Sequence, residues 1–215
     1  MKHYVILISG RRSNMESLLD AGLLGACAAV ISNRPDAAGL AAAASRGVAT
    51  VVIDHRGFAA RSDFDAALAA EIELHAPDLV LLAGFMRILG DDFVRRFEGH
   101  LLNIHPSLLP LFPGIKTHAQ ALAAGVRVHG CSVHFVTPSL DGGPIIAQAA
   151  VPVQADDDEA SLGRRVLAEE HLLYPRVARW FLEGRLRLVA GRAQLAGEMA
   201  VGGALHVPQT DQMPG

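Results

Sequence analysis

The sequence predicts an α/β fold built on a doubly wound, mostly parallel sheet with helices on both faces. Over the first half of the 215 residues, short apolar runs alternate with helix-compatible stretches. The apolar runs are continuous rather than alternating, which is typical of strands buried on both faces. Polar turns containing Gly, Pro or Asn separate the two kinds of segment. Together these observations indicate strand–helix units that build parallel neighbours.

Four strands and three helices are expected before Gly84. The strands span Tyr4–Ile8, Ala28–Ile31, Val48–Ile53 and Leu79–Ala83, and the helices span Asn14–Leu24, Asp36–Arg46 and Arg61–His75. In sheets of this kind, ligands bind beyond the carboxyl ends of the strands. The polar turns after the first, second and fourth strands are therefore where a site is expected.

The pattern changes after Gly84, and six further segments are expected. They are a short helix at Asp91–Phe97, a strand at Leu101–Ile104, a helix from about Thr117 to Gly125, β runs at Val128–Thr137 and Ile145–Val153, and a long helix from Glu159 to about Glu183. Gly184 supplies the stop for the last helix. The sequence thus predicts a single Rossmann-like domain over residues 1–188, with a C-terminal β-hairpin plus long helix, and a loosely ordered tail over residues 189–215.

Composition excludes several classes of protein. Hydrophobic residues make up 51% and charged residues 19%, which excludes an intrinsically disordered chain. No apolar run reaches the ~18–20 residues of a membrane span, and the first residues do not resemble a signal peptide. A net charge of −3 offers no basic field for nucleic acid. We expect a cytoplasmic protein with neither nucleic-acid nor membrane partners, in which Cys27 and Cys131 are reduced thiols.

The turn after the first strand is the first candidate site. It contains Arg12, Ser13 and Asn14 and opens a helix, whose unpaired N–H groups favour a phosphate. Ser and Asn are also common helix caps, and the turn is neither a G-x-G-x-x-G nor a Walker motif. The residues alone leave a phosphate site and a plain cap equally open.

The second candidate site is the strand that ends at His105. Asn103 and His105 are two residues apart, so both side chains point to the same side of an extended chain. An amide and a protonated imidazole aimed at one point can bind an oxyanion. Asp141, before two glycines, is either an ordinary turn residue or a third partner whose charge stabilises protonated His105. This trio suits a tetrahedral acyl intermediate and requires no protein nucleophile.

Competing chemistries have weaker support. Ser107 lies near His105, but the G-x-S-x-G elbow of a serine hydrolase is missing from the sequence. His129, Cys131 and His134 fall within six residues, yet in a strand His134 points away from the other two. The sequence contains neither H-E-x-x-H nor paired C-x-x-C, so no metal is expected.

Three further sets of residues are ambiguous from their spacing. Arg61, before a helix, is either a contact for an anionic ligand or a solvated surface residue. The segment Phe85–Leu89 is either an apolar wall for a flat heterocycle or a loop packed on the core. Glu170, within the last helix, is more simply explained as part of a solvated face.

Several of these segments together resemble the folate-dependent formyltransferases, and within them the branch that acts on glycinamide ribonucleotide. The match extends from the first strand to about Leu188. The segments that carry it are Asn103-Ile104-His105-Pro106-Ser107-Leu108-Leu109-Pro110, Pro113-Gly114, Leu140-Asp141-Gly142-Gly143-Pro144, Ser13-Asn14, Ala83 through Leu89, Thr117-His118, Ser132 through Thr137, Glu170-His171 and Tyr174-Pro175. One such match would mean little, but this many in order are highly specific.

The resemblance implies transfer of the formyl group of 10-formyltetrahydrofolate, the co-substrate, to the amine of glycinamide ribonucleotide in purine biosynthesis. It implies that His105 is catalytic, that Asn103 holds the oxyanion, and that Asp141 orients and charges His105. Carried over by position, the ribonucleotide contacts are Arg12, Ser13, Asn14 and Glu170, and the folate contacts are Arg61, Met86, Arg87, Ile88, Leu89, Asn103, Leu140 and Asp141. No metal is implied, and a homodimer is left open.

Two positions depart from the family pattern. Arg12 replaces the second Gly of the usual Gly-x-Gly-Ser-Asn loop, which would cost about 1 kcal/mol if that position needs φ > 0. Lys116 replaces a common His. Two enzymatic rivals, formyltetrahydrofolate deformylases and methionyl-tRNA formyltransferases, carry an extra domain for which this chain is expected to lack room. A binding module with a dead site would tolerate loss of His105 or Asp141, and both are present.

Overall fold

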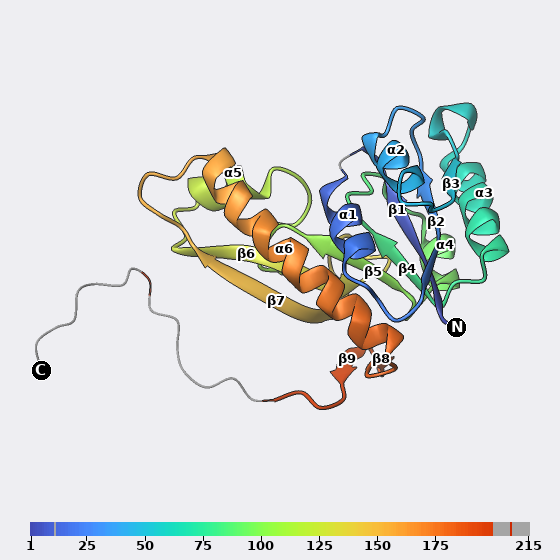
Figure 1. Cartoon of the computed structure of the whole chain (residues 1–215). Coiled ribbons are helices and arrows are strands. Elements are labelled where there is room, and N and C mark those ends of the chain that lie inside the picture. Colours follow the sequence, from blue (N-terminus) through green and yellow to red (C-terminus); the bar gives the residue numbers. More distant parts are fainter. Residues whose placement is uncertain (11, 200–206, 208–215) are drawn as a thin grey trace, which may run out of the picture.

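The computed structural model describes residues 1–10, 12–199 and 207. Its centre is a seven-stranded sheet in the order β3-β2-β1-β4-β5-β6-β7 (Figure 1). The strands are β1 (His3–Ile8), β2 (Ala26–Ser32), β3 (Thr50–Val52), β4 (Leu79–Leu82), β5 (Leu101–His105), β6 (Val128–Phe135) and β7 (Ile145–Pro152). Pairing is parallel from β3 to β5 and antiparallel between β5, β6 and β7. The predicted mostly parallel α/β sheet is confirmed.

Helices cover both faces of the sheet. They are α1 (Ser13–Asp20), α2 (Ala38–Ala44), α3 (Arg61–Leu74), α4 (Asp91–Arg96), α5 (Thr117–Ala123) and α6 (Glu159–Leu182). Alternate side chains of β1 enter two separate cores, because successive strand residues point to opposite faces. Ile6 packs in the core shared with α1, α2, α5 and α6, whereas Leu7 packs in the core shared with α3 and α4. The predicted two-sided cover is confirmed.

The predicted boundary at residue 188 falls inside a small hairpin. Strands β8 (Leu186–Val189) and β9 (Arg192–Leu195) form a two-stranded antiparallel sheet. Leu186 is buried in the core beside α6, which anchors the hairpin to the domain. The folded part therefore reaches Leu195 instead of ending at 188. Residues 200–206 and 208–215 of the predicted tail lie outside the described residues.

Helix α6 is tied to the sheet by Tyr174. The Tyr174 side chain is fully buried, and its hydroxyl lies 3.0 Å from the carbonyl oxygens of both Leu82 and Leu102. These carbonyls belong to neighbouring strands β4 and β5, so one hydroxyl serves two strands. Within the described residues, no helix combines the length and the apolar content that crossing a bilayer requires.

We expect Tyr174→Phe to lower the free energy of unfolding by about 1–2 kcal/mol, because the substitution removes a buried hydrogen-bond donor from two carbonyls. Urea denaturation measures the change. Tyr4→Phe is the matched control, since Tyr4 is also a buried tyrosine but pairs with Leu79, at the other end of β4 from Leu82. Equal losses in the two variants would show that the contacts to β4 and β5 contribute nothing.

Candidate functional site

The candidate site lies at the point in the sheet where the strand order reverses. β1 is flanked by β2 on one side and by β4 on the other, which makes the ends of β1 and β4 the switch point of the sheet. The turns after these two strands touch, because the Met86 N–H donates to Ser9 Oγ at 2.7 Å. Ser9 is buried, and the bond itself is partly buried. Two of the three predicted turns thus meet in space.

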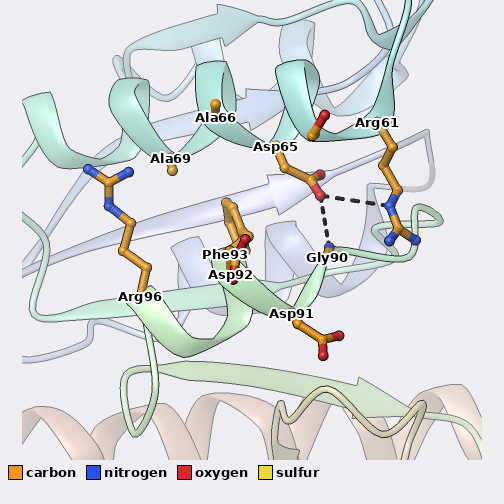
Figure 2. Close-up of a pocket in the computed structure, with 10 residues that line it drawn as sticks. Arg61, Asp65, Ala66, Ala69, Gly90, Asp91, Asp92, Phe93 and Arg96 are labelled. Carbon is orange, nitrogen blue, oxygen red and sulfur yellow. Dashed lines mark hydrogen bonds and ion pairs between the residues drawn. The ribbon is translucent and has the colours of Figure 1, made fainter.

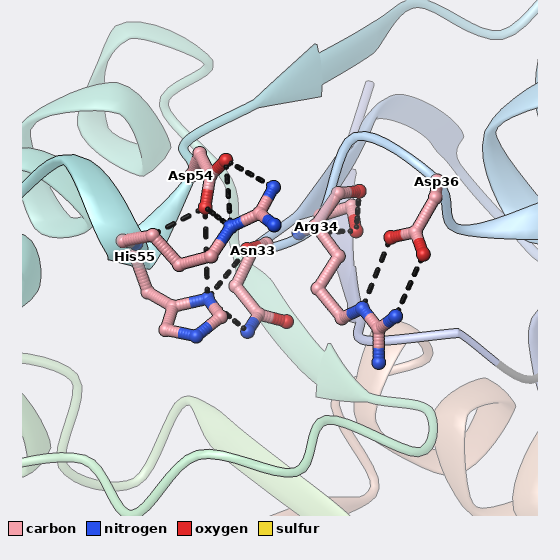
Figure 3. A network of polar contacts seen from close by, with 7 residues as sticks. Asn33, Arg34, Asp36, Asp54 and His55 are labelled. Carbon is pink, nitrogen blue, oxygen red and sulfur yellow. Dashed lines mark hydrogen bonds and ion pairs between the residues drawn. The ribbon is translucent and has the colours of Figure 1, made fainter.

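The third predicted turn, after β2, is occupied by its own polar contacts (Figure 3). Arg34 pairs with Asp36 at 2.6 Å within this turn, and Asp54 pairs with Arg56 at 2.7 Å in the neighbouring segment after β3. The Arg56 guanidinium lowers the pKa of Asp54 to about 2. Both arginines of this network are already neutralised, so we assign this turn no ligand.

The proposed polar trio is brought together at the end of β5. His105 is buried, and its Nδ1 lies 3.5 Å from Asp141 Oδ2, although the two residues are 36 positions apart. The other ring nitrogen, Nε2, lies 3.0 Å from the Phe112 carbonyl oxygen and donates to it. A second proton on the ring must therefore sit on Nδ1, facing the carboxylate. The predicted approach of Asp141 to His105 is confirmed.

His134 is a fourth member that the spacing argument missed. It lies opposite Asn103 in the antiparallel β5–β6 pair. Its Nδ1 lies 2.9 Å from the Phe135 carbonyl oxygen and donates to it, which leaves Nε2 to accept from Asn103 Nδ2 at 3.2 Å. Burial lowers the pKa of His134, which keeps this ring neutral as an acceptor. Its Nε2 also lies 3.8 Å from Asp141 Oδ1.

The loop that carries Asp141 is shaped by a glycine and by a hydrogen bond. Asp141 has φ +49, and its Oδ2 accepts from the Gly114 N–H at 2.8 Å. A Cβ on Gly143 would lie 1.8 Å from the Phe135 carbonyl oxygen, so only glycine allows the loop to approach β6 this closely. Asp141 is thereby held against the ends of β5 and β6.

Ser107 supports the Pro-rich loop from within. Its hydroxyl is fully buried and donates to the Leu111 carbonyl oxygen at 2.6 Å. Ser132 Oγ donates to the Ser107 carbonyl at 2.7 Å and accepts from the Leu109 N–H at 3.0 Å. The Ser107 hydroxyl is therefore committed to the loop, which agrees with the prediction that it is not a nucleophile.

The first turn connects to the last helix through Asn14. Asn14 Nδ2 donates to Glu170 Oε2 at 2.6 Å, and Glu170 is only 6% exposed. The residue-based expectation of a solvated Glu170 is wrong, because α1 packs on this face of α6. Asn14 Oδ1 is also buried and has no hydrogen-bond partner among the described residues. A ligand that donates a hydrogen bond would satisfy it.

Arg12 does not carry the backbone strain considered above. It caps α1 with φ −107, a value open to any residue, and its side chain lies 3.4 Å from Glu16. Ser13 is the first residue of the helix, so its side chain and Asn14 lie beside the free N–H groups. Arg12, where the family pattern has Gly, therefore adopts an ordinary backbone conformation.

The residues matched to folate contacts expose apolar surface. Met86, Ile88 and Leu140 are 70%, 61% and 58% exposed, whereas Leu89 is buried. The Arg87 guanidinium lies 5.6 Å from the centre of the Phe64 ring, and its buried Nε has no partner among the described residues. Exposed apolar side chains beside an unsatisfied donor suit a ligand that is both flat and polar at its edge.

A cavity of about 610 Å³ lies between α3 and α4, next to the loop that joins β4 to α4 (Figure 2). Arg61 lies at one end and Arg96 at the other, and the lining between them includes Asp65, Asp91 and Asp92. Arg96 is paired with Glu73. None of the trio around His105 lines this cavity, so we place the chemistry at His105 and not here.

His129 lies in a separate pair with His118. Its Nε2 is 3.2 Å from His118 Nδ1, and the ring is buried against Phe112. His134 contacts Asn103 on the other side of the strand, so the three residues considered for a metal do not converge. Among the described residues, no group of three His, Cys, Asp or Glu side chains is placed to hold a metal ion.

We expect the folded protein to lose stability as the pH falls from about 6.5 to 4. Burial, with the nearby charges of His118 and His105, lowers the pKa of His129 to about 4. As the pH falls, the unfolded chain therefore binds this proton first. The drop in the pKa from 6.5 to about 4 corresponds to about 3 kcal/mol in the free energy of unfolding, which is present above pH 6.5 and lost below pH 4. When the free energy of unfolding is measured by urea denaturation and plotted against pH, His129→Gln should flatten the acid limb of the curve. The exposed control His100→Gln should retain it, and an unchanged limb in His129→Gln would contradict the assignment.

Comparison with known proteins places this geometry in a family. The formyl transferase family model matches residues 2–178. The chain is 50% identical to the phosphoribosylglycinamide formyltransferase of Escherichia coli (strain K12), over 90% of this chain and 93% of that protein. It is 44% identical to the human trifunctional purine biosynthetic protein adenosine-3, over 85% of this chain and 18% of that protein.

Solved structures agree with the fold. The glycinamide ribonucleotide transformylase 1 of Symbiobacterium toebii superposes with a TM-score of 0.88 at 46% identity, covering 91% of this chain and 94% of that one. The phosphoribosylglycinamide formyltransferase of Coxiella burnetii gives a TM-score of 0.88 at 44% identity, covering 92% and 94%. The family model covers most of the chain, and the likeness to these proteins spans nearly their whole length. The chain belongs to the formyl transferase family.

Proposed function

We propose that the chain transfers the formyl group of 10-formyltetrahydrofolate to the primary amine of glycinamide ribonucleotide, a step of purine biosynthesis. The observation that carries the proposal is the 3.5 Å approach of Asp141 to His105, two residues along β5 from Asn103. The names of relatives at 41–50% identity over nearly the whole chain support the substrates. The formyl transferase family supports formyl folate as the co-substrate.

In the proposed reaction, the substrate amine attacks the formyl carbon and N10 of the folate leaves. A C–N bond to the amine forms, the C–N10 bond breaks, and a proton passes from the amine to N10. The formyl oxygen carries negative charge in the tetrahedral intermediate. Asn103 can bind this oxygen, because its amide has two N–H groups and only one faces His134.

His105 supplies the positive charge in this scheme. Because Nε2 donates to Phe112, the proton that charges the ring sits on Nδ1. Asp141 Oδ2 faces that nitrogen, so a carboxylate lies beside the positive charge. The separation of 3.5 Å exceeds an ordinary hydrogen bond, so the Nδ1–H is not fully committed to Asp141. We assign His105 to oxyanion stabilisation and Asp141 to holding the charge and orientation of His105.

The ribonucleotide and the folate are assigned to the two turns that meet at Ser9. The phosphate is placed at the start of α1, against Arg12, Ser13 and Asn14, where free N–H groups favour an anion. Glu170, joined to Asn14, is assigned to the glycinamide group. The folate is assigned to the surface formed by Met86, Arg87, Ile88, Leu89, Asn103, Leu140 and Asp141, with its anionic glutamate toward Arg61.

The proposal is tested by following tetrahydrofolate release by absorbance, with and without glycinamide ribonucleotide. Transfer predicts turnover that depends on the amine and one formylated product per folate released. Turnover at the same rate without the amine would instead mean hydrolysis of the formyl group. No turnover in either case would refute both reactions.

A further inference from the structure

Asp65 is a buried carboxylate to which no step above assigns a role. It lies on α3, one turn after Arg61, and is only 7% exposed. Its Oδ2 accepts from the Gly90 N–H at 2.8 Å and lies 4.0 Å from Arg61 Nε (Figure 2). One side chain therefore contacts both the arginine assigned to the folate glutamate and the end of the loop assigned to the folate ring.

The burial of this charge calls for a specific reason. An ionised carboxylate loses much of its hydration when buried, and only good partners offset that loss. Asp65 has one full hydrogen bond and one long ion pair, while its Oδ1 is buried without a partner among the described residues. Partners this incomplete are a poor arrangement for stability alone. They are more readily explained by a role in the site.

The loop between β4 and α4 is held at both ends by buried side chains. Ser9 accepts from the Met86 N–H at one end, and Asp65 accepts from the Gly90 N–H at the other. Met86 and Ile88, between these two anchors, remain exposed. Anchors of this kind fix the backbone of a binding loop while leaving its side chains free for a ligand.

We propose that Asp65 is a positioning residue for the formyl-folate co-substrate. It fixes the Gly90 end of the loop and draws Arg61 toward that loop. The surface that binds the folate ring and the guanidinium that binds the folate glutamate therefore stay at a fixed distance from each other. The proposal rests on the proposed function, because that function assigns the folate to this loop. Asp65 itself touches no reacting atom in this scheme.

Gly90 offers a second way to disturb the same contact. A Cβ at Gly90 would lie 2.8 Å from Asp65 Oδ2, too close for the carboxylate to stay where it is. The backbone of Gly90, at φ −73 and ψ 159, is open to alanine without strain. Gly90→Ala should therefore act mainly by displacing Asp65.

The test compares Asp65→Ala, Asp65→Asn and Gly90→Ala with the control Asp63→Asn. Asp63 is an exposed carboxylate in the first turn of the same helix, so its substitution changes the charge equally without touching the loop. KM for 10-formyltetrahydrofolate, KM for glycinamide ribonucleotide, kcat and the melting temperature are measured for each. We expect Asp65→Ala and Gly90→Ala to raise KM for the folate about tenfold, and Asp65→Asn, which keeps an acceptor for Gly90, about threefold.

KM for the ribonucleotide should stay within twofold in every variant, and Asp63→Asn should behave like the wild type. A merely structural role would lower the melting temperature and the active fraction but leave the folate KM unchanged, and that result would overturn the proposal. Equal rises in both KM values would overturn it as well. If Asp65→Ala does not fold, Asp65→Asn and Gly90→Ala decide. Loss of amine-dependent turnover in the wild type would instead refute the proposed function, so the two failures are distinguishable.

Discussion

His105→Ala should lower kcat for formyl transfer by about a thousandfold or more, within the range expected for a group that stabilises charge or moves a proton in the transition state. The substitution removes the ring whose Nδ1 faces Asp141 and to which the proposed reaction assigns the positive charge. Steady-state tetrahydrofolate release in the presence of glycinamide ribonucleotide measures the loss. The fold should remain, because α6 and the two cores do not depend on this imidazole.

His100→Ala is the matched control for that experiment. His100 is an exposed histidine whose Nδ1 lies 2.9 Å from the Asp78 carbonyl oxygen, away from the candidate site. We expect the control to keep full activity, and both variants to keep the circular dichroism spectrum of the wild type. If His105→Ala retained activity within about tenfold, a difference of only ~1.4 kcal/mol, the role assigned to His105 would be wrong.

Asp141→Asn should lower kcat by about a hundredfold, because it removes the charge that faces His105 while leaving the shape of the loop. Asparagine tolerates the φ of +49 at this position, and its side-chain oxygen can still accept from the Gly114 N–H. Without the carboxylate, the imidazole loses the opposite charge that lies 3.5 Å from its Nδ1.

Steady-state tetrahydrofolate release in the presence of glycinamide ribonucleotide measures this loss. Asp156→Asn, which changes an exposed carboxylate, is the control and should keep the kcat of the wild type. A kcat for Asp141→Asn within about threefold of the wild type would contradict the role assigned to Asp141.

Much of the fold could be predicted because its strands are buried on both faces. Continuous apolar runs at β1, β2 and β4 cannot be satisfied at a half-exposed surface, so their pattern directly indicates a covered parallel sheet. Element ends were less predictable, because they depend on tertiary contacts. β3 is shorter than the predicted run, and the hairpin of β8 and β9 is held by the burial of Leu186 under α6.

The candidate site could be predicted only in part. Asn103 and His105 lie on one strand, and their common direction follows from the period of two. The role of His134 could not be predicted, because its place beside Asn103 depends on the register of the antiparallel β5–β6 pair, across 31 positions of sequence. Asp65 was not predicted for a different reason, since it acts on a backbone N–H, and backbone groups leave no mark on residue type. Helical spacing alone favours a solvated Glu170, because spacing does not reveal which face of α6 is covered by α1.

The most direct test of the central claim is a double-mutant cycle between His105 and Asp141, read as kcat/KM in a radiolabelled formyl-transfer assay. If the carboxylate acts through the imidazole, the variant carrying both His105→Ala and Asp141→Asn should be no less active than His105→Ala alone. Losses that multiply in the double variant would show that the two residues act independently, and would contradict the proposed coupling.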